Sequence, residues 1–166
     1  MAASSPPHQE SPHAQHPIEL PVGVFSGAFE AEIVEVGPNV VAPTTVIRTD
    51  ETWKIACKWS LDGLLAPALD GTWSIQAVVE GLGASVEITR PPQQVPLNAA
   101  APFPLPRNYA LDVVFGPGSV NLGGQPSVMA RVGVALTYRF PVGIGGQPGP
   151  IATFLELGAV QIYQGS

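Results

Sequence analysis

Two stretches of alternating residues, Thr52–Ser60 (TWKIACKWS) and Thr72–Glu80 (TWSIQAVVE), decide the fold that this sequence predicts. In each stretch nearly every second residue is apolar and large, and most residues between them are polar or small. Successive side chains of a β-strand point to opposite faces of a sheet, so this period of two predicts strands with one buried face. The two patterns mirror each other, which predicts an antiparallel hairpin with Trp59 opposite Trp73.

Strand signals continue on both sides of this pair. Six prolines between Pro91 and Pro106 exclude a helix or a central strand there and predict an extended crossover between sheets. The final strand should bulge near Gly158, where its apolar phase shifts. Seven or eight strands with turns between them and no helical period predict an all-β fold, an antiparallel β-sandwich. The other expected strands span residues 29–34, 44–48, 85–89, 109–115, 128–140 and 151–163.

The predicted architecture loosely resembles an immunoglobulin-type sandwich. Cys57 and Trp59 are expected on a core-facing strand, and Tyr109 lies near the start of a late strand. The single cysteine has no partner, and Leu111 stands where a second cysteine would be wanted. The resemblance therefore implies an immunoglobulin-like architecture only, and architecture does not determine function.

The first 17 residues differ in composition from the rest of the chain. They are mostly Pro, Ser, His, Gln and Ala, with too little apolar surface to favour ordering, so we expect a disordered tail over residues 1–17. Residues 18–166 should form a single domain. All three histidines, His8, His13 and His16, lie in this tail, where a mobile chain offers no preformed metal site, and we expect neither a metal nor a cofactor.

Composition restricts the partners and the location of the protein. The net charge is −6, and only 7 residues are Lys or Arg, so we expect no binding to nucleic acid and no binding to a membrane. One cysteine excludes an intramolecular disulfide. The N-terminus has no apolar core of a secretory signal, so residence in the cytoplasm is the default expectation, with export by a non-classical route left open.

The expected folded body has no histidine, which removes the usual base of Ser-His and Cys-His catalysis and the commonest metal ligand. Cys57, on an apolar strand face, should be buried and unreactive. Asp62-Gly63 and Asp70-Gly71 are typical of turns, in which the aspartate binds the backbone. We therefore expect no catalytic residues.

We expect a non-catalytic structural or protein-interaction module, a subunit or adaptor of a larger assembly that associates with itself or with a protein partner. Only 12% of the residues are charged, against about a quarter in an ordinary domain, so much of the surface should favour being covered. In the final strand, alternation places Phe154 on one face and Leu155 on the other, one towards the core and one towards a partner. The residues expected to contact a ligand or partner are Trp53, Phe154, Leu155 and Tyr163.

Two alternatives come from other classes of function. A carbohydrate-binding module would use an exposed tryptophan as a stacking platform; Trp53, near a strand end, is the best candidate, whereas Trp59 and Trp73 are expected in the core. A hydrolase would need two carboxylates across a cleft, about 5–9 Å apart. Its candidate carboxylates are Asp62, Asp70, Glu80, Glu87 and Asp112.

Overall fold

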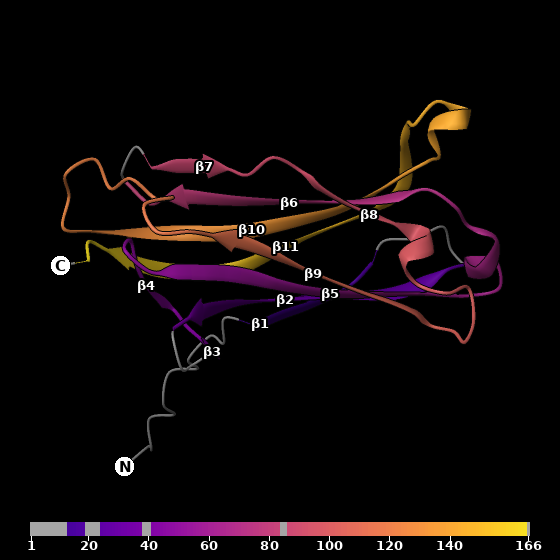
Figure 1. Ribbon diagram of the computed structural model, residues 1–166, viewed down its shortest axis with the longest axis horizontal. Helices are drawn as coiled ribbons and strands as arrows, with labels where there is room; N and C mark the ends of the chain where they lie inside the picture. The colour runs from indigo at the N-terminus through magenta and orange to yellow at the C-terminus, as the bar shows by residue number, and fades with distance from the viewer. Residues whose placement is uncertain (1–12, 19–23, 38–40, 84–85, 166) are drawn as a thin grey trace, which may run out of the picture.

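The computed structural model describes residues 13–18, 24–37, 41–83 and 86–165, which fold into two packed β-sheets (Figure 1). Sheet A has the strand order β1-β2-β5-β9, and β3 also pairs with β2. Its strands are β1 (His13–Pro17), β2 (Ser26–Val36), β3 (Val41–Pro43), β5 (Thr52–Asp62) and β9 (Arg107–Phe115).

Sheet B has the order β4-β11-β10-β6-β7, and β8 also pairs with β6. All its pairs are antiparallel except β4 with β11, which is parallel. Its strands are β4 (Val46–Arg48), β6 (Thr72–Gly81), β7 (Glu87–Thr89), β8 (Gln93–Pro96), β10 (Ser127–Arg139) and β11 (Pro148–Tyr163). The helical segments in the described residues are 3-10 turns: η1 (Ala66–Ala68), η2 (Leu97–Ala99) and η3 (Val142–Ile144). The all-β sandwich expected from the sequence is confirmed.

The core lies between the sheets and follows the alternation read from the sequence. In β5 the residues Trp53, Ile55, Cys57, Trp59 and Leu61 are buried, and those between them are more exposed. Aromatic rings from the two sheets meet at the centre of the core. Trp59 stacks on Tyr109 of the neighbouring strand, at a centroid distance of 5.4 Å.

The prediction that β5 and β6 form a hairpin is wrong. The two strands lie in different sheets: β5 pairs with β2 and β9, whereas β6 pairs with β7, β8 and β10. Trp59 and Trp73 therefore meet edge to face across the core, with ring centroids 6.3 Å apart, instead of lying side by side in one sheet. Alternation determines which side chains point inward, but it does not distinguish a neighbour in the same sheet from one in the facing sheet.

Part of the expected tail is ordered. Residues 13–17 form β1, which pairs antiparallel with β2 so that His13 is opposite Glu32 and Pro17 is opposite Ala28. Pairing along an open strand edge uses backbone groups, so a segment with few apolar residues can still join a sheet. The rest of the expected tail, including His8, lies outside the described residues.

Two short strands, β3 and β8, were also not expected, and both add to existing strand edges. The proline-rich segment still crosses from sheet B to sheet A, as predicted, after the short pairing of β8. The predicted bulge is present as well: the register of β10 and β11 shifts between Arg131 and Gly133, and Gly158 has φ +89°. The likeness to immunoglobulin domains stays a prediction.

Candidate functional site

Two of the five candidate carboxylates form turns. The carboxylates of Asp62 and Asp70 accept hydrogen bonds from the backbone N–H of Gly63 and Gly71, at 2.7 and 2.8 Å. Both glycines have φ in the left-handed region, at +114° and +136°. These aspartates therefore shape the backbone, as the sequence predicts.

The other three candidate carboxylates lie on the sheets. Asp112 forms an ion pair with Lys54 at 2.6 Å. Glu80 and Glu87 are opposite each other in β6 and β7, but they line different hollows. Among the residues that the structure describes, no group of three or more His, Cys, Asp or Glu side chains is placed to hold a metal ion.

The cysteine and the tryptophans belong to the core. Cys57 is 1% exposed, and burial, with a contribution from the charge of Asp112, raises the pKa of its thiol to about 12. The prediction that this thiol is buried is confirmed, and a raised thiol pKa disfavours the reactive thiolate. Trp53, expected to be the most exposed tryptophan, is 2% exposed and stacks on Phe115 at 3.9 Å, so this expectation is wrong. The stacking explains its burial at a strand end.

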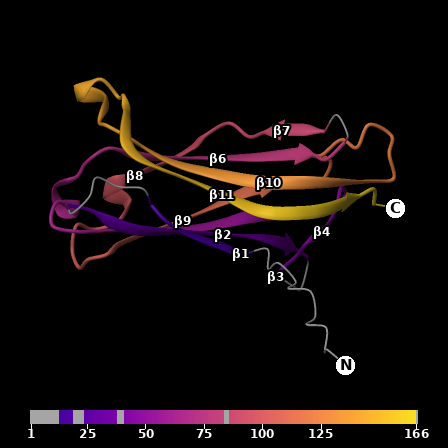
Figure 2. The ribbon, with the colours of Figure 1, turned by 180° about the vertical axis from the view of Figure 1, so that it is seen from behind.

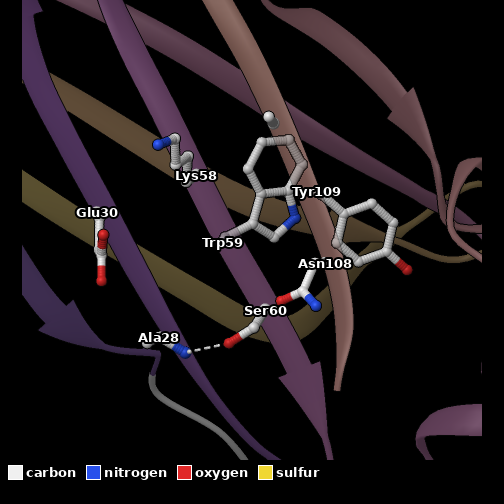
Figure 3. A pocket seen from close by; sticks show the side chains of 8 residues that line it. Ala28, Glu30, Lys58, Trp59, Ser60, Asn108 and Tyr109 are labelled. Atoms are coloured by element: carbon white, nitrogen blue, oxygen red, sulfur yellow. Dashed lines mark hydrogen bonds between the residues drawn. The ribbon is translucent and has the colours of Figure 1, made fainter. Parts of the chain in front are cut away.

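A hollow of about 490 Å³ lies on the outer face of sheet A (Figure 3). Two rows of residues across β2, β5 and β9 line it: Ala28, Ser60 and Asn108 in one row, and Glu30, Lys58 and Ala110 in the next. The alanines leave room, and the Ser60 hydroxyl accepts a hydrogen bond from the backbone N–H of Ala28 at 3.3 Å.

This hollow offers polar groups and no exposed ring. Trp59 and Tyr109 also border it, but both are buried and pack against Trp73 in the core. A sugar would therefore find hydrogen-bonding groups there, among them the ammonium of Lys58, but no aromatic surface on which to stack.

The outer face of sheet B carries an apolar area that we call the Phe154 patch: Phe154 and Ala152 of β11, Gly133 and Ala135 of β10, and Val78 of β6. Phe154 is 58% exposed, whereas its neighbour Leu155 is 1% exposed in the core. The ring of Phe154 lies against Gly133, where an added Cβ would be 2.6 Å from its Cζ. The glycine thus lets the ring lie low on the sheet. This separation of Phe154 from Leu155 is the one predicted by alternation.

Charged residues of both signs border the Phe154 patch on one side. Arg131 lies opposite Glu80 in the β6–β10 pair, and its guanidinium is 3.6 Å from the carboxylate of Glu156. Together with Phe154 and Gly133 they surround a shallow hollow of about 230 Å³.

Tyr163, the last of the expected contact residues, is half-buried beside an acidic cluster at the end of β11. It is paired with Arg48 of β4, whose guanidinium contacts Asp50 at 2.9 Å and Glu51 at 3.2 Å. Glu35 of β2 joins this cluster through a hydrogen bond with Glu51, which is the main reason that the pKa of Glu35 is raised.

Arg107 is a buried residue that the sequence analysis did not single out. It is 4% exposed, and its guanidinium donates hydrogen bonds to the backbone carbonyls of Ala66 and Leu69 and to those of Leu97 and Ala100, at 2.5–3.1 Å. Arg107 therefore joins η1 and η2, two turns about 30 residues apart in the chain. A lone arginine at the start of a strand gave no signal of this role.

Comparisons of the chain with protein-family models, with curated proteins and with solved structures found no match. A search of the described residues for helices able to cross a bilayer also found none that is long and apolar enough.

Proposed function

We propose that the domain is a non-catalytic interaction module that associates with a second copy of itself through the outer face of sheet B. The observation that carries this proposal is Phe154, a large aromatic side chain 58% exposed on a strand that is paired along its length. Exposed aromatic residues among small apolar residues, with charged groups at the border, are typical of the centres of protein interfaces.

The surroundings of Phe154 suit close approach of another sheet. Ala152, Ala135 and Gly133 are small, so a facing sheet can approach to roughly the 10 Å separation of packed sheets. Arg131 and Glu80 lie together at the border of the patch. In a two-fold arrangement the same surface meets itself, so the arginine of one copy can face a carboxylate of the other.

Sedimentation equilibrium of wild type and three variants tests the proposal. Wild type should associate, and Phe154→Asp should give a folded monomer because it puts a charge in the interface. Leu155→Asp should unfold the domain, because it buries an unpaired carboxylate in the core. Val114→Asp is the matched control, since Val114 is 48% exposed on the other sheet, and it should associate like wild type.

Two results would contradict this proposal. One is a wild-type chain that sediments as a 17.3 kDa monomer at every concentration. The other is a Phe154→Asp variant that associates as strongly as wild type and Val114→Asp.

A further inference from the structure

One end of the sandwich presents apolar side chains on three separate loops. We call this the loop end: residues 63–71 between β5 and β6, residues 97–106 before β9, and residues 140–147 between β10 and β11. Figures 1 and 2 show that all three lie at the same end of the long axis, with the loop of η3 projecting away from the body. Their most exposed large apolar residues are Leu64 (86%), Phe103 (67%), Val142 (90%) and Ile144 (69%).

The loop end is also free of charge at its tips. Residues 63–69, 97–106 and 140–147 contain no Asp, Glu, Lys or Arg. Among the described residues, the charged residues that flank these loop segments include Asp62 and Arg139 at the ends of β5 and β10, and Asp70 two residues before β6. Polarity therefore changes from charged residues at the strand ends to apolar residues at the loop tips. Four exposed apolar residues gathered at one end differ from the isolated exposed apolar residues that are normal on protein surfaces.

Part of the backbone of these loops offers no free donor. Five prolines in them (Pro67, Pro102, Pro104, Pro106 and Pro141) have no N–H group at all. In η3, the N–H groups of Ile144 and Gly145 donate to the carbonyls of Pro141 and Val142, at 3.0 Å each. Fewer unsatisfied donors lower the free energy needed to move a loop out of water.

Two of the three loops are fixed to each other before any partner binds. The guanidinium of Arg107 holds carbonyls of both η1 and η2. Tyr109 adds a hydrogen bond from its hydroxyl to the carbonyl of Leu97, at 2.9 Å. Ordering of these two loops therefore adds little to the entropy lost on binding.

We propose that the loop end docks on an uncharged lipid surface, with the tips of the three loops inserted among the headgroups. Separate projecting tips with no charge suit a soft, flat surface with an apolar interior. The net charge of −6 and the lack of Lys and Arg in the tips favour zwitterionic lipid over anionic lipid. The scarcity of Lys and Arg weakens electrostatic attraction to anionic lipid, but it does not oppose the insertion of apolar side chains. This surface is separate from the Phe154 patch.

Flotation of the full chain with phosphatidylcholine vesicles tests this inference. Wild type should float with the vesicles at both low and high salt, because apolar insertion is not screened. Val142→Ser combined with Ile144→Ser should lower the binding constant about tenfold or more for each side chain removed, as should Phe103→Ser. Leu82→Ser, in an exposed loop after β6 at the opposite end, is the matched control and should float like wild type.

Thermal unfolding of each variant verifies that it is folded, as expected for changes at exposed tips. A wild-type chain that does not float, or loop-end variants that float as well as Leu82→Ser, would overturn the inference. Loop-end variants that change the oligomeric state while no form of the protein floats would overturn it too, and would assign the loop end to a protein contact instead.

Discussion

At the scale of single residues, we expect the contact between the carboxyl groups of Glu35 and Glu51 to make stability depend on pH. The pKa of Glu35 is raised above its ordinary 4.5 by the hydrogen bond with Glu51, by desolvation and by the negative charge of Glu51, whereas Arg48 opposes the shift. A carboxyl with a raised pKa in the folded state stabilises the fold while it is protonated. This contribution is complete below the unfolded pKa and is lost as pH rises through the folded pKa.

We therefore expect Glu35→Gln, which keeps a hydrogen-bond donor without the charge, to raise the urea midpoint at neutral pH. It should also reduce the loss of stability between the ordinary pKa of 4.5 and neutrality. Urea unfolding at several pH values measures both effects. Glu87→Gln, an exposed carboxylate on β7, is the control. A Glu35→Gln variant with the same pH profile as wild type would show that the pair does not govern this dependence.

Arg107 is the second residue whose role is open to a direct test. Two of its four hydrogen bonds to carbonyls are buried and two are partly buried. Removal of the guanidinium takes away all four, and the hydroxyl of Tyr109 still donates to the carbonyl of Leu97. We expect Arg107→Ala to lower the free energy of unfolding by about 3 kcal/mol or more, since hydrogen bonds to charged groups contribute roughly 1.5–3 kcal/mol each and are not additive. Arg131→Ala, with a side chain 60% exposed, should change it by less than about 1 kcal/mol. Equal effects of the two variants in chemical denaturation would refute this assignment.

At the scale of elements, the two faces of β5 should respond differently to truncation. Trp59 is 3% exposed between Tyr109 and Trp73, so Trp59→Ala should destabilise by roughly 3–5 kcal/mol. Lys54, on the opposite face, forms a partly exposed ion pair with Asp112, so Lys54→Ala should cost about 0.2–1 kcal/mol. Urea denaturation of both variants provides the comparison. A larger effect at Lys54 would mean that the outer face of sheet A is covered.

The strands themselves could be predicted from alternation, because large apolar residues such as Trp53, Ile55 and Trp59 recur at every second position and indicate one buried face. Their pairing could not, since the pattern of β5 and β6 suits a hairpin and a pair of facing strands equally. β1 was not predicted for a different reason. It pairs with β2 through backbone groups, which are the same in every sequence apart from proline and so give no pattern of side chains.

Only part of the candidate site could be predicted from the sequence. Phe154 follows from alternation in one strand, and its separation from Leu155 was predicted. The loop end requires knowledge of which loops share an end, and that depends on strand order. The role of Arg107 depends on two turns that are distant in the chain, so no local pattern indicates it.

At the scale of the whole molecule, the two proposed surfaces are compatible. The Phe154 patch lies on the outer face of sheet B, and the loop end lies at one tip of the long axis (Figure 2). A two-fold dimer through sheet B could therefore leave both loop ends free. The low content of charged residues, 12%, fits a chain with more than one surface that is covered in its working state.

Thiol labelling beside Phe154 tests self-association through sheet B most directly. Ala152→Cys places a thiol in the Phe154 patch, and the native Cys57 stays silent because it is buried, with a pKa of about 12. Ala110→Cys, exposed on sheet A, is the control. We predict that maleimide labelling of Ala152→Cys slows as protein concentration rises, while labelling of Ala110→Cys does not. A labelling rate at Ala152→Cys that is independent of protein concentration would contradict the proposed interface.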